Sequence, residues 1–196
     1  MDKRIILLIF LFAFQFANAQ EVRFKNGQLD NTLVYPIVSL VGNPEAEKTL
    51  NQHILDIVSE YNTQEYCIGQ YGYVQKTNFI QLNFYFNCID LDESVTAYYL
   101  FNLSNGELCP PSEMLLDKEK KRFTKLLHER IASHLTDVGT EEPSKELIEA
   151  IEIDDCAVKL AEEGMEITID SYESWPKEAL IISWNDLRPF LKSTFL

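Results

Sequence analysis

The segment QEYCIGQYGYVQKTNFIQLNFYFNCID, residues 64–90, decides the fold because it predicts one β-hairpin in a single register. When the segment is folded about Thr77-Asn78, one face is apolar and carries Tyr71, Tyr73, Phe84 and Phe86. The opposed pairs are Tyr71–Phe84, Tyr73–Leu82, Gln75–Ile80, Gly69–Phe86 and Cys67–Cys88. The other face is mostly polar and is predicted to meet water; it carries Gln70, Gly72, Gln81, Asn83 and Asn87. A slip of one residue would exchange the two faces, so the register is strongly specified.

The rest of the chain alternates between strand and helix patterns. Pro36 marks the strand 34–41 as an edge or a strand start, and Asn43-Pro44 opens a helix that runs to about Tyr61. The further elements expected are a strand at 95–103, helices at 117–135 and 144–151, strands at 156–160, 165–169 and 179–183, and a terminal helical turn at 185–191. These elements predict an α+β fold, in which an antiparallel sheet and two main helices form a single domain.

Residues 1–19 have the pattern of a secretory signal peptide. Lys3 and Arg4 precede an apolar run of about 12 residues, and Ala17-Asn18-Ala19 offers the small residues that signal peptidase recognises. The run is shorter than the ~20 residues that span a bilayer. We therefore expect a secreted or periplasmic protein whose single domain covers residues 20–196, with no membrane span after cleavage.

The charge and the cysteines limit the partners and the chemistry. A net charge of −14 disfavours binding to nucleic acid or to an anionic membrane by charge, and attracts basic partners. The four cysteines in an oxidising compartment predict two disulfides. The hairpin register predicts Cys67–Cys88, which leaves Cys109–Cys156 by elimination.

No assembled catalytic or metal-binding set is visible in the sequence. The three histidines lie outside any metal-ligand or catalytic spacing; they are His53, His128 and His134. The acidic loop Asp90, Asp92 and Glu93 lacks the glycine and the distal glutamate of a calcium loop. We therefore expect no cofactor, no metal and no catalytic residue. The acidic pairs at 154–155 and 162–163 have the pattern of exposed turn acids.

Several motifs resemble a bacterial extracytoplasmic domain family of unknown function. These motifs are Tyr35-Pro36, YYLFNLSNG at 98–106, SEMLL at 112–116 and IISWNDLRPFL at 181–191. The family occurs in lysozyme-sensing anti-sigma factors and beside peptidoglycan deacetylase domains, and also as single exported proteins. The chain departs from it at 91–94, where Leu-Asp-Glu-Ser replaces a Gly-Gly-Ala-His-like loop, and it has none of the metal-binding motifs of the deacetylase.

The leading functional expectation is a non-catalytic binding module of the cell envelope or exterior. The resemblance implies a basic protein such as lysozyme, or a peptidoglycan fragment, as its ligand. The expected contact surface is the acidic loop with its aromatic neighbours, namely Asp90, Asp92, Glu93, Tyr98 and Tyr99, because aromatic rings beside acids suit a basic target. The same loop can equally be a plain solvated turn. The alternatives are a cell-wall-directed hydrolase with an unrecognised acid site and a structural accessory protein.

Overall fold

The computed structural model describes residues 20–29, 33–62, 67–88, 93–139, 144–169, 175–176 and 178–195. A five-stranded sheet has the order β1-β2-β3-β4-β5, and a three-stranded sheet has the order β6-β7-β8. The strands of the large sheet are β1 (Val22–Leu29), β2 (Leu33–Leu40), β3 (Cys67–Gln75), β4 (Phe79–Cys88) and β5 (Glu93–Asn102). Those of the small sheet are β6 (Ala157–Leu160), β7 (Gly164–Thr168) and β8 (Leu180–Ser183).

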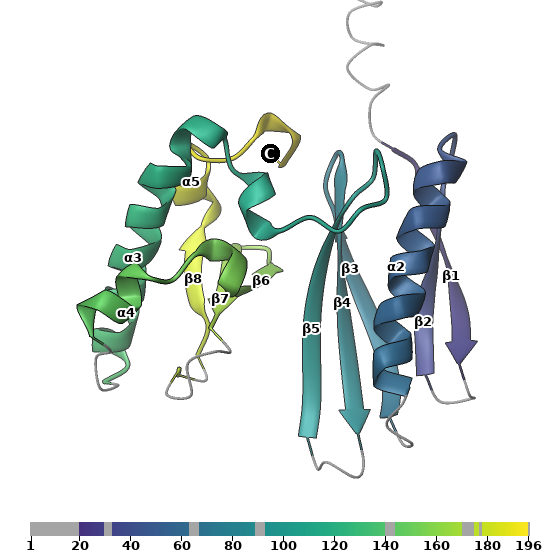
Figure 1. Ribbon diagram of the computed structural model, residues 1–196, viewed down its shortest axis with the longest axis horizontal. Coiled ribbons are helices and arrows are strands. Elements are labelled where there is room, and N and C mark those ends of the chain that lie inside the picture. The colour runs from purple at the N-terminus through teal and green to yellow at the C-terminus, as the bar shows by residue number, and fades with distance from the viewer. Residues whose placement is uncertain are drawn as a thin grey trace, which may run out of the picture.

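Two long helices accompany the sheets, which confirms the predicted α+β class. Figure 1 shows α2 among the strands of the large sheet and α3 on the outer side of the small sheet. The α-helices are α2 (Pro44–Asn62), α3 (Lys120–Asp137), α4 (Lys145–Glu149) and α5 (Trp184–Leu187). Short 3₁₀ turns lie at η2 (Pro111–Met114), η3 (Asp117–Glu119), η4 (Ile153–Asp155) and η5 (Ser193–Phe195). In the described part of the chain, no helix has both the length and the hydropathy needed to cross a membrane.

The central hairpin forms in the predicted register. Tyr71 faces Phe84, Gly69 faces Phe86 and Cys67 faces Cys88. β5 extends this pairing on the other side of β4, where Tyr98 faces Asn83. The pattern of alternating apolar residues therefore specified both the strands and their alignment, because this register places Phe84 and Phe86 together on one buried face.

The face of the sheet that carries Phe84 and Phe86 packs against α2; we call it the covered face. α2 begins as predicted, since the Asn43 Oδ1 accepts a hydrogen bond from the Ala46 N–H at 3.4 Å. Its apolar side, which includes Leu50, Ile54 and Val58, is fully buried against the strands. The stack of Tyr61 on Phe86, with ring centroids 3.8 Å apart, closes this core near the end of the helix.

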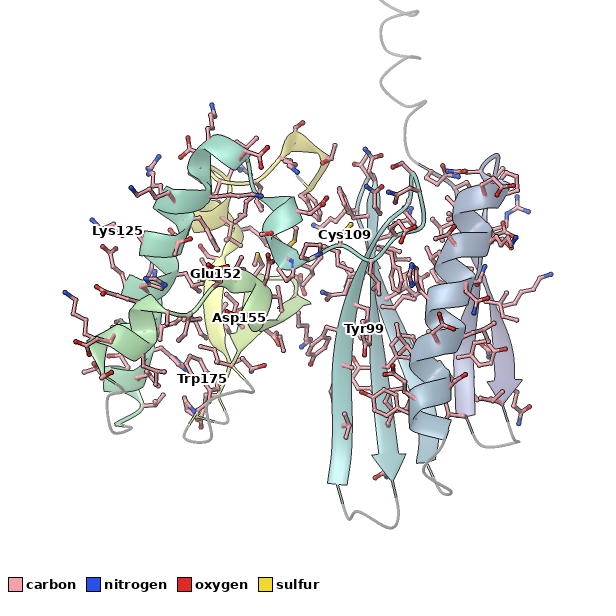
Figure 2. The ribbon with its side chains drawn as sticks, viewed as in Figure 1. Tyr99, Cys109, Lys125, Glu152, Asp155 and Trp175 are labelled. Carbon is pink, nitrogen blue, oxygen red and sulfur yellow. The ribbon has the colours of Figure 1, made fainter. Side chains whose placement is uncertain are left out.

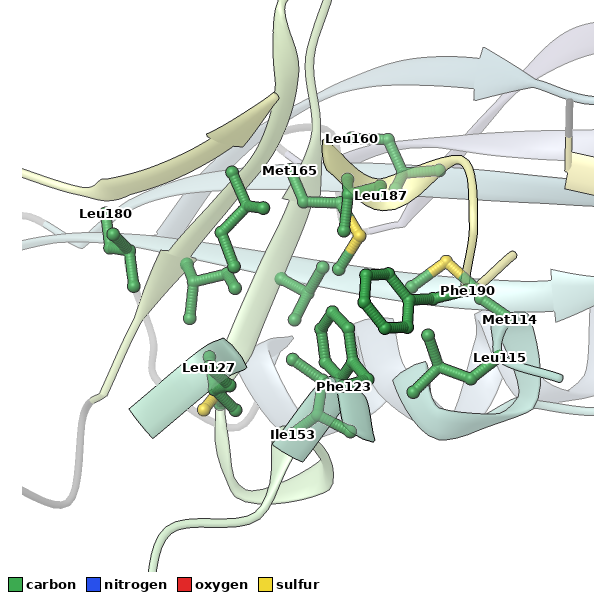
Figure 3. Packing of buried hydrophobic residues seen from close by; sticks show 14 of the residues in the cluster. Met114, Leu115, Phe123, Leu127, Ile153, Leu160, Met165, Leu180, Leu187 and Phe190 are labelled. Carbon is green, nitrogen blue, oxygen red and sulfur yellow. The ribbon is translucent and has the colours of Figure 1, made fainter. Parts of the chain in front are cut away.

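The opposite face of the large sheet, which we call the open face, meets the small sheet over part of its length. Phe79 and Leu100 join a second core that contains the small sheet and α3. Figure 3 shows the centre of this core, where Phe123 and Phe190 pack edge to face with ring centroids 5.6 Å apart. The small sheet thus covers one end of the open face and leaves the other end accessible.

The prediction that this polar face meets water is wrong at Gln81 and Asn83, which are only 2% and 6% exposed. The Gln81 Nε2 donates to the Val158 carbonyl at 2.8 Å, and its Oε1 accepts from the Leu160 N–H at 2.7 Å. The side-chain amide of Gln81 therefore takes the place of a strand partner for β6 and joins the two sheets. The buried amide is tolerated here because its nitrogen and its oxygen each form a hydrogen bond.

Three further expectations differ from the structure. Tyr73 was expected in the core, but 52% of it is exposed. Cys109 and Cys156 are both buried thiols that are not joined to each other, so the expected second disulfide is absent. The Sγ atom of Cys109 lies 3.8 Å from the Glu107 carbonyl, and that of Cys156 lies 3.4 Å from the Glu152 carbonyl.

The strand β1 was not expected from the sequence. The expected signal peptide lies outside the described residues, as do the side chains of Cys67 and Cys88.

Candidate functional site

The structure does not bring the five expected binding residues onto one described surface. Asp90 and Asp92 lie outside the described residues, and of Glu93 only the backbone, at the start of β5, is described. Tyr98 and Tyr99 are consecutive in β5, so their side chains point to opposite faces of the sheet. Tyr98 faces Asn83 on the open face, whereas Tyr99 faces Leu82 on the covered face.

Tyr99 has a structural role in the covered face. Its ring packs edge to face on Phe84 with centroids 5.9 Å apart, and Figure 2 shows it on the large sheet, away from Glu152 and Asp155. Burial, followed by the charge and hydrogen bond of Tyr61, raises the pKa of Tyr99 to about 12. The neutral phenol is therefore held in the core at physiological pH.

Two hollows on the large sheet are candidate ligand sites. The first, which we call the edge groove, has a volume of about 610 Å³ and is lined by Asn26, Val34 and residues 69–73. The second, which we call the face groove, has a volume of about 330 Å³ and is lined by Gln70 and residues 85–87 and 94–96. Gln70 lines both grooves, so they form neighbouring parts of one surface. Both volumes lie within or near the range of ligand sites in proteins.

The edge groove exists because β2 leaves the sheet soon after it begins. β2 pairs with β3 only at Leu33 and Gly69, where a Cβ on Gly69 would lie 2.9 Å from the Leu33 side chain. Farther along β2, the side chains of α2 take the place of β3. The Asn51 amide bonds both the N–H and the carbonyl of Val38, at 2.8 and 2.6 Å, and Glu47 accepts from the Leu40 N–H at 2.8 Å.

Aromatic rings bridge the edge groove between β3 and β1. The Tyr71 hydroxyl donates to the Asn26 Oδ1 at 2.6 Å, and burial raises the pKa of Tyr71 above its ordinary value. The ring of Tyr73 stacks on Phe24 with centroids 4.1 Å apart. The half-exposed Tyr73 ring is therefore held in place by its neighbour, as a rigid apolar surface suitable for contact with a ligand.

Gly72 lies in the middle of β3 and lines the edge groove. A Cβ at this position would meet only Tyr85 ring atoms, at 3.8 and 3.9 Å, which is ordinary contact. Packing within the chain therefore does not require glycine here. Glycine inside a strand weakens it and often marks the close approach of a ligand or of another backbone.

Lys159 and Asn83 add polar groups to the open face where it meets the small sheet. The Lys159 Nζ bonds the Glu166 Oε2 at 2.6 Å, and this bond is the largest influence that raises the pKa of Lys159. Tyr85 and Tyr98 also raise it, which places both phenols in the electrostatic environment of the ammonium group. The buried Oδ1 of Asn83 has no hydrogen-bond partner among the described residues.

None of the three histidines lines either groove. His53 pairs with Glu107 at 2.9 Å, while His128 and His134 contact the carbonyls of Ile151 and Glu178 at 2.8 and 3.0 Å. The described residues contain no group of three or more side chains placed to hold a metal ion. Burial raises the pKa of the Cys109 thiol to about 11, which keeps it protonated and a poor nucleophile.

Comparison with known proteins relates the chain through its fold. No model of a known protein family matches the sequence, and no curated protein matches it. Among solved structures, a DUF3298 family protein from Pseudomonas aeruginosa PAO1 superposes with a TM-score of 0.51 at 11% identity, over 90% of this chain and 96% of that one. A DUF3298 family member from Bacteroides fragilis NCTC 9343 does so with a TM-score of 0.51 at 12% identity and the same coverage. The chain therefore has the fold of DUF3298 proteins, a domain of unknown function.

Proposed function

We propose that this protein is an exported, non-catalytic module that binds a macromolecule of the cell envelope or exterior through the edge and face grooves. The observation that carries the proposal is that both grooves meet at Gln70 and combine exposed tyrosine rings with uncharged hydrogen-bonding groups. Gly72 supports it, because the chain keeps a bare backbone position at this surface without an internal packing need. Such a surface suits recognition rather than proton transfer or nucleophilic attack.

The sequence supports the envelope setting. Residues 1–19 have the pattern of an export signal, and the motifs at 98–106 and 181–191 resemble the family found in lysozyme-sensing anti-sigma factors and beside peptidoglycan deacetylase domains. A basic protein such as lysozyme is one candidate ligand, because a net charge of −14 accelerates encounter with a cationic partner. A peptidoglycan fragment is the other, because the lining of the grooves is uncharged.

The direct test is titration of the mature protein with lysozyme and with soluble peptidoglycan fragments at ~0.15 M salt, where long-range charge attraction is screened. Binding of either probe should shift the amide NMR signals of Gln70 and its neighbours. Binding that disappears entirely at this salt concentration would reveal nonspecific attraction and would contradict the proposal for that probe.

The variant Gly72→Val separates binding from stability. A side chain at position 72 has room in the folded chain, and valine favours a strand more than glycine does, so stability should be kept or raised. The same side chain would occupy the groove and should weaken binding at least tenfold. Gln52→Ala is the matched control, because Gln52 lies on α2 and its side chain bonds only Asp56 there. Unchanged affinity in Gly72→Val would place the ligand elsewhere.

A further inference from the structure

We propose that the edge groove takes an extended peptide segment of a partner protein, which pairs with the outer edge of β3 as an added strand. This inference rests on the proposed binding function and specifies the chemistry of the partner. It follows from the direction of the backbone groups of β3, from the hydrogen bonds that hold β2 to α2, and from the rings that line the groove.

The hydrogen bonds of the central hairpin show which backbone groups of β3 point outward. The Lys76 N–H donates to the Phe79 carbonyl at 2.8 Å, so these two residues form a hydrogen-bonded pair. Such pairs alternate along an antiparallel ladder, and the register of β3 with β4 is continuous. Gly72 and Val74 therefore bond to β4, whereas the N–H and carbonyl groups of Tyr71 and Tyr73 point away from it.

Within the described part of the chain, these outward groups have no strand to pair with. β2 meets β3 only at Gly69, and the Val38 and Leu40 groups of β2 that would come next are bonded to Asn51 and Glu47 of α2. Pro36, which lies between them and the paired end, has no N–H to donate. The fold thus keeps the sheet open along β3, and the α2 contacts prevent β2 from closing it.

The free edge has the length and lining of a peptide site. Residues 71–75 span roughly 13 Å at the ~3.3 Å rise of a strand, which matches four or five residues of an added strand. Donors and acceptors that repeat at every second residue are matched by an extended backbone, the mode known as β-strand addition. The rings of Tyr71 and Tyr73 lie beside this edge, and Gly72 leaves its open-face side bare.

Two edges of the large sheet, those of β1 and β3, differ in protection. β1 carries Arg23 and Lys25, and charged side chains are a common device against unwanted strand pairing. Residues 71–75 of β3 read Tyr-Gly-Tyr-Val-Gln and contain no charge and no proline. An unprotected edge inside a tyrosine-lined groove is therefore suited to one particular partner, an uncharged extended segment.

Hydrogen exchange in the unliganded protein is the first test. The amide protons of Tyr71 and Tyr73 should exchange at least tenfold faster than those of Gly72 and Val74, which bond to β4. Strong protection of all four amides in a monomer would overturn the proposal, because the edge would already be paired. Concentration-dependent protection together with a dimer in sedimentation would also overturn it, since a second copy would then be the occupant.

Peptide binding is the second test, made with a phage-displayed library of seven-residue peptides at 0.15 M salt. The selected peptide should slow exchange at Tyr71 and Tyr73 at least tenfold. N-methylation along it should reduce affinity at every second residue, because only alternate peptide N–H groups face β3. Loss at every position alike, or at none, would overturn strand addition.

The failure of the inference and the failure of the binding function are distinguishable. Chitotriose serves as a glycan probe and lysozyme as a folded protein probe. If either shifts the Gln70 and Gly72 signals while no peptide protects Tyr71 and Tyr73, the peptide inference fails and the binding function stands. If no probe, peptide included, perturbs either groove, both fail.

Discussion

The two faces of the large sheet are built from alternate residues of the same strands, yet they have different uses. Phe84 on the covered face is fully buried under α2, whereas its neighbour Tyr85 on the open face is 41% exposed. The covered face is sealed by apolar side chains along its length. The open face is joined to the small sheet through the amide of Gln81 and is accessible beyond it. One face thus stabilises the fold, and part of the other remains exposed to solvent.

The largest effect should come from breaking the covered face. Phe84→Ala should lower the free energy of unfolding by about 4 kcal/mol, because it removes a fully buried ring and leaves a cavity under α2. Denaturant unfolding measures this change. Tyr85→Ala, one residue away on the open face, is the matched control and should cost far less. Equal costs for the two variants would contradict the distinction between the faces.

A disulfide at the end of the central hairpin should have the next largest effect. Cys67 and Cys88 face each other at a non-hydrogen-bonded position, since the pairing alternates from Lys76 and Phe79. At such positions the Cα atoms approach to ~4.5 Å, a separation that a disulfide can span. Reducing a bond that closes a loop of about 20 residues should lower stability by ~3 kcal/mol.

Non-reducing peptide mapping of the oxidised protein checks the connectivity, and unfolding with and without reductant checks the energy. The variant Cys88→Ser should lose the sensitivity to reductant. A peptide that links Cys67 to Cys109 or Cys156 would contradict the pairing.

Gln81→Leu tests the junction of the two sheets. The leucine fills a similar volume but leaves the Val158 carbonyl and the Leu160 N–H without partners in a buried site. We expect a loss of about 2 kcal/mol or more, since a buried unsatisfied polar group typically costs ~1–3 kcal/mol. Amide exchange in β6 should accelerate more than exchange in β3. Uniform acceleration would show that Gln81 does not act at the junction.

Tyr99→Phe tests the covered face through its pH dependence. The pKa of Tyr99 rises from 10.0 to about 12 on folding, so between these values the native state keeps a proton that the unfolded chain releases. Stability is therefore full below pH 10 and falls as the pH rises towards 12. The variant should show a shallower fall in unfolding measurements across this range.

The pKa of the Cys109 thiol is also raised, so its contribution to the stability of the folded protein falls as the pH rises from 9 to about 11. It is present in both proteins, so the difference between them isolates Tyr99. An identical pH slope in the wild type and Tyr99→Phe would contradict the buried placement of the phenol.

The smallest effect is expected at Asn83, the second buried amide of the open face. Its Oδ1 has no partner among the described residues, so Asn83→Leu removes an unsatisfied acceptor. We expect a change within about 0.5 kcal/mol, or a gain in stability, because replacing an unbonded polar atom by an apolar group of similar size removes its desolvation cost. A loss as large as that of Gln81→Leu would reveal a bonded partner for Asn83.

The sequence predicted elements with strong local signals and missed those without them. The hairpin register and the start of α2 at Asn43-Pro44 are confirmed, since opposed aromatic residues and a helix cap are local features. β1 was missed because Asn26-Gly27 has the composition of a turn. In the structure Gly27 lies opposite Tyr35 in a strand pair, where a Cβ would collide with the tyrosine ring. The collision depends on a cross-strand partner that local propensity does not reveal.

The candidate site was only partly accessible to sequence reasoning. Gln70 and Gly72 were placed on the polar face. Pro36 was expected to mark an edge or a strand start, whereas it lies within β2, between β1 and β3 in the sheet order. No signal indicated that Asn51 and Glu47 would hold β2 away from β3. Adjacent tyrosines at 98 and 99 were assigned to one surface, although the period of two in a strand separates them.

By itself, the sequence determined the two strands of the central hairpin, their register and the division into an apolar and a polar face, because side-chain alternation and aromatic pairing act between near neighbours. Only the tertiary structure decided which part of the polar face is buried by the small sheet and where β2 leaves β3. Those outcomes depend on hydrogen bonds between segments far apart in the chain, such as Gln81 to Val158 and Asn51 to Val38. A polar side chain has the same appearance in sequence whether its partner is water or a distant backbone.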